Sequence, residues 1–132
     1  WKFSVLDSRA DYSVLEGAEE CIHSLPVDFF MNEDSTSLNR FSDILLLGHD
    51  WAEDEERLHG LLFAGYEGRL GVIGSKSKWG AYVKSSLEAG ISQAKLDEVN
   101  CPIGLDIGAE SPEEIAIATL AEIMSKFKTS LL

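Results

Sequence analysis

Two continuous apolar runs constrain the fold more than any other feature of this sequence. They occupy residues 43–48 (Asp-Ile-Leu-Leu-Leu-Gly) and 69–74 (Arg-Leu-Gly-Val-Ile-Gly). Short runs without polar alternation are typical of parallel strands that helices cover on both faces. A helical pattern follows each run, at residues 51–64 and 76–89. Strands that alternate with helices in this way predict an α/β fold with a parallel sheet.

Weaker patterns complete the expected order of elements. Residues 2–7 and 19–24 are expected to form two short strands. A short helix is expected to follow Ser92 as far as Val99, and a longer one to run from Pro112 to about Lys126. Residues 26–39 lack periodicity and contain a Ser-Thr-Ser run, so we expect a loop there that can include one helical turn.

The helix that begins at Pro112 has the clearest start signal. Ser111 and Glu114 have the spacing of a capping box, and Pro112 fits the first helical turn. Residues 115–124 are apolar around most of the helix circumference, which predicts that this helix is largely buried. In the helix at 76–89, one face is expected to be buried and Gly90 to end the helix; that face carries Trp79, Tyr82, Val83 and Leu87.

Composition limits the classes of partner. The 132 residues form one domain, and a hydrophobic content of 45% fits an ordinary globular chain. A net charge of −12 repels phosphate backbones, so we expect no nucleic-acid partner. No apolar run approaches the length of a membrane span, and two cysteines suit a reducing cytoplasm. Metal-ligand spacings and a nucleophile elbow are absent from the sequence, so no metal ligand or catalytic residue is assigned.

The first expected strand ends at Asp7, which creates a problem of topology. In a doubly wound dinucleotide-binding fold, an acidic residue ends the second strand, about 20 residues after a glycine-rich turn. Nothing precedes Trp1 here, so the chain is expected to lack the central first strand and to form two half-sheets with open edges. An upstream fragment, a symmetry mate or a different strand order could resolve this; the alternative is a shorter natural α/β domain.

The turn at residues 74–78 (Gly-Ser-Lys-Ser-Lys) is the first candidate binding site. It follows an expected strand and opens an expected helix, where backbone amides and the helix dipole can hold a phosphate. Gly74 and Ser75 would supply amide and hydroxyl donors, and Lys76 and Lys78 would supply charge. The alternative is that Ser75 only caps the helix and the lysines are solvated.

Two further loops and one strand end supply the remaining candidates. His49 and Asp50 follow another strand, where ligands of open α/β sheets bind; alternatively Asp50 only caps a helix. Asp7 either binds a hydroxylated group such as a ribose or pairs with Arg9. In the loop before Pro112, backbone can approach a ligand at Gly104 and Gly108, and Asp106 either contacts that ligand or orders its own loop.

Several of these segments, in this order, resemble the C-terminal domain of the XdhC/CoxI family of xanthine dehydrogenase accessory factors. Residues 5–9 look like the family's second strand with its Asp-x-Arg end, and residues 71–78 look like its Gly-Leu-Ile-Gly-Ser-Arg-x-Lys turn. Residues 47–50 are similar to its Thr-His-Asp-His segment, with Gly48 and Trp51 in place of the threonine and second histidine. Residues 101–122 match most closely. The family's N-terminal domain and its Gly-x-Gly-His turn are absent.

The resemblance implies a Rossmann-like three-layer sandwich and a cofactor-binding chaperone rather than an enzyme. Family members bind molybdenum cofactor, aid its sulfuration and deliver it to a molybdenum hydroxylase apoenzyme. The implied partners are that apoenzyme and a cysteine desulfurase, and we expect either a homodimer or pairing with a missing N-terminal segment. Two alternatives stay open: an NAD(P)-binding oxidoreductase domain, which Asp7 permits, and an interaction module that binds no ligand.

Overall fold

Short parallel strands run through the middle of the molecule. The computed structural model describes residues 1–130. In that part of the chain, β1 (Val5–Asp7) pairs with β2 (Cys21–His23), and β3 (Asp43–Leu46) pairs with β4 (Arg69–Val72). Both pairs are parallel, and they form two separate two-stranded sheets. The expected α/β class and the expected split into two half-sheets are therefore both observed.

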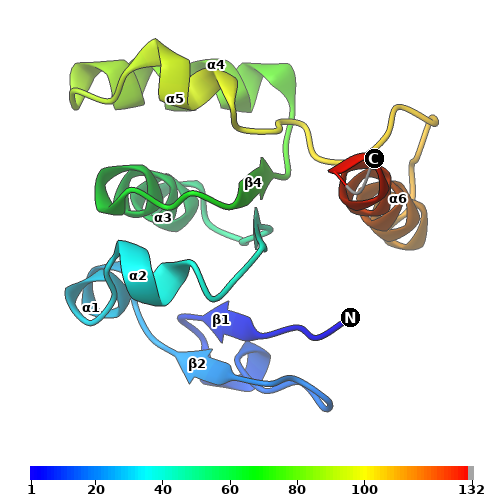
Figure 1. Ribbon diagram of the computed structural model, residues 1–132, viewed down its shortest axis with the longest axis horizontal. Helices are drawn as coiled ribbons and strands as arrows, with labels where there is room; N and C mark the ends of the chain where they lie inside the picture. The colour runs from blue at the N-terminus through cyan, green and yellow to red at the C-terminus, as the bar shows by residue number, and fades with distance from the viewer. Residues whose placement is uncertain (131–132) are drawn as a thin grey trace.

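The two sheets lie edge to edge, with β1 between β2 and β3 (Figure 1). A further extended segment follows the outer edge of β4: the amide of Asn100 donates to the carbonyl of Leu70 at 2.9 Å, and the amide of Ile103 donates to that of Val72 at 3.0 Å. The bridge between Gly71 and Asn100 is also parallel. The spatial order is therefore β2, β1, β3, β4 and residues 100–103.

Helices cover both faces of the strands, which makes three layers. A short 3₁₀ turn follows β1, and the longer helices come later in the chain; the helical elements are η1 (Ala10–Tyr12), α1 (Pro26–Met31), α2 (Ser35–Leu38), α3 (Trp51–Ala64), α4 (Lys76–Glu88), α5 (Gln93–Asp97) and α6 (Pro112–Ser130). Helices α1 to α5 stack on one side of the strands, and α6 lies on the other (Figure 1). Within residues 1–130, no helix is both long and apolar enough to cross a bilayer.

The main core lies between α3, α4 and the faces of β3 and β4 that point toward them. Leu46 and Val72 from the strands meet Leu58 and Leu61 from α3, and Tyr82 from α4 closes the cluster. The opposite face of β3 contributes Leu45, which lines a small space with Ile123 of α6. Alternation along a strand sends neighbouring side chains to opposite faces, which is why Leu45 and Leu46 serve different layers.

The expectation of a loop at residues 26–39 is wrong. The segment holds α1 and α2, and Leu38 of α2 is completely buried. Asp34 and Ser37 form a capping box that starts α2, with the Ser37 amide donating to Asp34 Oδ1 at 2.9 Å. Helices this short carry too little periodicity to be recognised in the sequence. Packing and capping determine whether they form.

The expectation that α6 is largely buried is also wrong. Ala118 and Thr119 are buried, but Ile117 is 62% exposed and Leu120 is 49% exposed. The helix packs on the sheet along one flank only, so apolar residues on the far side remain in solvent. The same correction applies to Leu87 of α4, which is 45% exposed, because the buried stripe of that helix runs through Lys78, Tyr82 and Ser86.

Candidate anion site at the carboxyl edge of the strands

Three loops leave the strands at the same edge. β3 and β4 are parallel and in register, with Leu46 beside Val72, and residues 100–103 run parallel beside β4. The loops at 48–50, 74–78 and 104–108 therefore begin at one rim. β1 ends there as well, because Ser8 Oγ donates to Glu53 Oε2 in the first turn of α3 at 2.9 Å.

The chain order reverses at the boundary between β1 and β3. β2 lies outward from β1 in one direction, and β4 lies outward from β3 in the other. In open α/β sheets, ligands bind beyond the carboxyl ends of the strands at such a reversal. The rim beside the 48–50 loop is therefore the position where this rule leads us to expect a ligand.

The N-terminus of α4 carries no carboxylate. Ser75 caps the helix by accepting a hydrogen bond from the Lys78 amide at 3.2 Å. The amides of Lys76 and Ser77 meet no acceptor among the described residues. Gly74 has φ +142°, and a Cβ there would lie 2.5 Å from Lys78 Cδ, so the turn needs glycine. The free amides, the helix dipole and the exposed Lys76 side chain make this end of α4 electropositive.

The N-terminus of α3 is instead occupied by its own carboxylate. Asp50 Oδ1 accepts from the Glu53 amide at 3.0 Å, and this backbone hydrogen bond is the main cause that lowers the pKa of Asp50. His49 is exposed and contributes a smaller lowering of the same pKa. An anionic ligand at this helix end would meet a charge of its own sign.

The N-terminus of α6 is occupied in the same way, and its predicted capping box is confirmed. The Glu114 amide donates to Ser111 Oγ at 3.1 Å, and the Ser111 amide donates to Glu114 Oε2 at 2.9 Å. The Glu110 amide donates to the same carboxylate oxygen at 3.0 Å. Backbone hydrogen bonds from Ser111 and then Glu110 lower the pKa of Glu114.

Asp7 is engaged by its neighbour. Arg9 donates to it from Nε at 3.0 Å, from a terminal nitrogen at 3.1 Å and from its amide at 2.8 Å. The side-chain hydrogen bond from Arg9 is the main cause that lowers the pKa of Asp7. A ribose hydroxyl would have to compete with this pair, so the geometry favours the pairing interpretation over ribose binding.

The loop at 104–108 uses its glycines for its own structure. The Gly104 amide donates to Glu122 Oε2 at 2.6 Å, and a Cβ on Gly104 would lie 3.3 Å from that of Ala118. This close approach fixes the loop against α6. Gly108 has φ +73° with open space around it, and Asp106 is exposed.

Lys78 is buried, whereas the sequence pattern suggested a lysine that faces a ligand or solvent. Its side chain is 5% exposed, and Nζ donates to the carbonyl of Ile73 at 3.1 Å. The same ammonium lies 3.9 Å from Asp54 Oδ2 and 5.6 Å from the centre of the Trp51 ring. Lys78 therefore holds the turn from beneath, and Lys76 is the exposed lysine of the turn.

A buried charged cluster beneath the rim was missed by sequence reasoning. Asp54 Oδ2 accepts from the Gly48 amide at 2.9 Å, and Asp54 Oδ1 accepts from Arg57 at 3.1 Å. A Cβ at Gly48 would lie 2.3 Å from Asp54 Oδ1, which explains the glycine at this position. The i,i+3 spacing of Asp54 and Arg57 was a visible signal, but in the sequence it looked like solvated charge.

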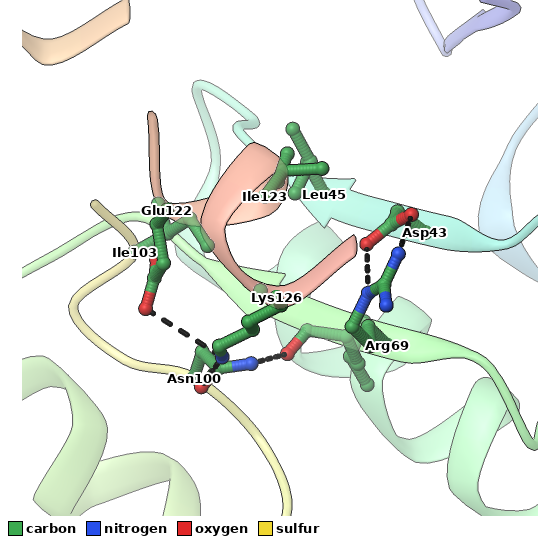
Figure 2. A pocket seen from close by; sticks show the side chains of 10 residues that line it. Asp43, Leu45, Arg69, Asn100, Ile103, Glu122, Ile123 and Lys126 are labelled. Carbon is green, nitrogen blue, oxygen red and sulfur yellow. Dashed lines mark hydrogen bonds and ion pairs between the residues drawn. The ribbon is translucent and has the colours of Figure 1, made fainter. Parts of the chain in front are cut away.

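Two cavities of the described structure lie away from these loops. A small space of about 10 Å³ lies beneath α6, where Asp43 and Arg69 form an ion pair and Lys126 donates to Asn100 (Figure 2). An open depression of about 390 Å³ lies between α1 and α3, lined by residues such as Phe30 and His59. Neither space is lined by residues of the 48–50, 74–78 or 104–108 loops.

Comparison with known proteins places the chain in a family. The family model described as the XdhC Rossmann domain matches residues 1–123. The uncharacterized protein YqeB of Escherichia coli strain K12 is 38% identical over 55 residues, which cover 42% of this chain and 10% of YqeB. The matched stretch is thus about a tenth of the length of that relative. Because the family model spans most of the sequence, the chain belongs to the XdhC Rossmann domain family of xanthine dehydrogenase accessory proteins.

Proposed function

We propose that this domain holds the phosphate group of molybdenum cofactor at the N-terminus of α4 and takes part in passing the cofactor to a molybdenum hydroxylase. One observation carries the proposal. Three helices follow the loops that begin at this rim, and α3 and α6 present carboxylates at their own N-termini, whereas α4 is capped by the neutral Ser75 hydroxyl. An anion therefore finds a complementary charge at α4.

The residues at α4 fit a phosphate group. The Lys76 and Ser77 amides are free to donate, and the Lys76 ammonium adds a positive charge in a chain of net charge −12. Lys78 supports the turn from below through Ile73, so it would position the amides without contacting the ligand. When bound, the cofactor supplies a molybdenum centre whose redox chemistry is used in the recipient enzyme.

In this proposal, the domain binds the cofactor, shields it and transfers it to the recipient enzyme. The rim carries donors and a cation but no residue to which we assign a nucleophilic role. The proposed recipient is a molybdenum hydroxylase apoenzyme in the cytoplasm, and a cysteine desulfurase is the proposed source of sulfur for the cofactor. Family membership supports this role, and the charge pattern at the three helix ends supports the location.

The test places a carboxylate where the phosphate is proposed to bind. Aspartate is as good an N-cap as serine, so Ser75→Asp should keep the free energy of unfolding while repelling the phosphate. We expect the Kd for purified molybdenum cofactor, measured by calorimetry, to rise at least about tenfold. Ser92→Asp, at the N-cap of α5, is the matched control and should bind normally.

Two outcomes would contradict the proposal. If Ser75→Asp binds the cofactor as tightly as the native protein, the phosphate does not lie at α4. If NAD(P) binds and molybdenum cofactor does not, the domain is a dinucleotide-binding domain and the proposed role is wrong.

A further inference from the structure

We propose that the exposed indole of Trp51 is a stacking platform for the pterin ring of the cofactor, beside the position proposed for the phosphate at α4. This inference rests on the proposed function, because it assigns the other end of the same ligand. Its support is the place of Trp51 at the rim and the way in which α4 holds that residue.

Trp51 is the first residue of α3 and lies at the rim where the 48–50 loop ends. It follows the cap residue Asp50, and 56% of its surface is exposed. The reversal of strand order leads us to expect a ligand at this part of the rim. An aromatic surface is therefore available at the position that the rule indicates.

The backbone and the ring of Trp51 both contact α4. The hydroxyl of Tyr82, a residue that is 1% exposed, donates to the Trp51 carbonyl at 2.8 Å. The two ring centres are 6.2 Å apart with an angle of 65° between the rings, which is an edge-to-face contact. A ring that the fold already holds loses little conformational freedom when a ligand stacks on it.

Lys78 connects the indole with the 74–78 turn. Its Nζ lies 5.6 Å from the centre of the Trp51 ring and donates to the carbonyl of Ile73 at 3.1 Å. Lys78 is 4% exposed, so this ammonium lies on the protein side of the indole and leaves the solvent side open. One buried group thus contacts both the ring and the residue that precedes the turn, which places the two parts of the proposed site next to each other.

The two helix ends suit the two ends of a pterin phosphate. The Asp50 carboxylate at the start of α3 repels an anion but does not repel a neutral ring. At α4, the Lys76 and Ser77 amides, which meet no acceptor among residues 1–130, attract the phosphate. Planar heterocycles stack on aromatic side chains, and an electron-rich indole suits an electron-poor pterin. The indole therefore provides a contact for the part of the ligand that the α4 amides do not bind.

Two substitutions separate aromatic stacking from simple apolar contact. Trp51→Leu keeps an apolar side chain but removes the aromatic face, so we expect the calorimetric Kd for purified molybdenum cofactor to rise about tenfold. Trp51→Phe keeps an aromatic face, and its Kd should stay within about threefold of the native value. Phe63→Leu, at an exposed aromatic position near the other end of α3, is the matched control and should bind normally.

Either of two results with these variants would overturn the proposal. Trp51→Leu could bind the cofactor as tightly as the native protein, which would mean that the ligand does not touch the indole. Trp51→Leu and Trp51→Phe could weaken binding equally, which would mean that the aromatic face has no part in it. A measurement on the native side chain decides the question even if Trp51→Leu does not fold.

That measurement follows the indole N–H signals of the full-length protein labelled with ¹⁵N-tryptophan. Trp1, Trp51 and Trp79 each give one signal, and the spectrum of Trp51→Phe identifies the signal of Trp51. The probe is 6-hydroxymethylpterin, which has the pterin ring but no phosphate. We expect the Trp51 indole proton to shift upfield through the ring current of the stacked pterin, while the signals of Trp1 and Trp79 stay in place. An unmoved Trp51 signal, or equal shifts of all three signals, would overturn the proposal.

The same probe distinguishes failure of this inference from failure of the proposed function. Ser75→Asp should leave the Trp51 shift with 6-hydroxymethylpterin unchanged, because that probe has no phosphate to repel. If Ser75→Asp weakens cofactor binding but the Trp51 signal does not move with the probe, the phosphate position stands and the stacking platform is wrong. If the Trp51 signal moves but Ser75→Asp binds the cofactor normally, the platform stands and the phosphate position at α4 is wrong.

Discussion

Asp54 is the residue on which the rim depends most. It is 1% exposed and connects the Gly48 amide at the end of β3 with Arg57 on α3 and, at longer range, Lys78 on α4. These contacts tie together the two loops that begin at β3 and β4. The chain therefore balances a buried carboxylate against two buried cations beneath the proposed site.

Replacing Asp54 should destabilise the domain strongly. Asp54→Ala leaves Lys78 buried without its carboxylate and Arg57 with only its 3.4 Å contact to Glu53, and breaking a buried ion pair in this way costs about 3–5 kcal/mol. We expect that loss in the free energy of urea unfolding, and a smaller loss for Asp54→Asn. Asp106→Ala, at an exposed position, is the control. A loss below about 1 kcal/mol for Asp54→Ala would mean that the cluster is not formed.

The two lysines of the 74–78 turn should differ in their effects. Lys76 is exposed beside the free amides of α4, and Lys78 is buried beneath them. Lys76→Ala should weaken cofactor binding about three- to tenfold with little change in stability, because it removes one surface charge near the phosphate. Lys84→Ala, an exposed change on the same helix, should leave the Kd unchanged. Equal weakening by both variants would indicate only a general effect of charge.

Sequence spacing predicted some residue roles and missed others for a physical reason. The caps at Ser75, Asp50 and Ser111 are local, so their spacing was sufficient. We expected Lys76 and Lys78 to behave alike, but residues two apart on a helix do not share a face, and the structure exposes the first and buries the second. The Ser8–Glu53 bond joins residues 45 apart in the chain, and only the fold brings them together.

Helix α6 shows what an element's sequence can and cannot predict. Its start was predicted from the Ser111–Glu114 spacing, because a cap involves only neighbouring residues. The burial of α6 was not predicted correctly. Apolar residues show that a helix face can be covered, but they do not show whether a neighbouring element covers it. Three exposed apolar residues with 3- and 4-residue spacing mark the uncovered face: Ile117, Leu120 and Met124.

The cap of α6 should make stability depend on pH in the acidic range. Hydrogen bonds in the folded state hold the pKa of Glu114 below its ordinary value of about 4.5. The carboxylate therefore stabilises the fold above that value, and this contribution is lost as the pH falls toward the lowered pKa. Glu114→Gln should be less stable than the native protein at pH 7, and the difference should shrink below pH 4.5.

Unfolding midpoints measured from pH 7 to pH 3 check this prediction. Glu113→Gln removes a charge from the same helical turn and has no part in the capping box, so it is the matched control. A difference between native protein and Glu114→Gln that stays constant across the range would show that the carboxylate does not cap α6.

At the scale of the whole molecule, alternation of elements predicted the fold class. The two apolar runs became β3 and β4, and the helical patterns after them became α3 and α4. The split into half-sheets followed from strand order, because removing a central strand leaves two open edges. Helices α1 and α2 were missed because they have six and four residues and carry no visible periodicity.

The proposed anion site lies in a domain whose net charge is strongly negative. The net charge of −12 sets the long-range field, but salt screens that field within about 8–10 Å. Contact at the rim is governed by nearby groups: the Asp50 and Glu114 carboxylates at two helix ends, and the free amides with Lys76 at the third. In the proposed function, the distribution of charge between these helix ends, rather than the total charge, selects the position of the phosphate.

Amide shift mapping during a titration with purified molybdenum cofactor tests the central claim most directly. The largest ¹⁵N and ¹H shift changes should occur at residues 74–77, the turn with unpaired amides, and Ser75→Asp should abolish them. Changes centred on residues 50–53 or 111–114, or in the depression between α1 and α3, would contradict the assignment of the phosphate to α4.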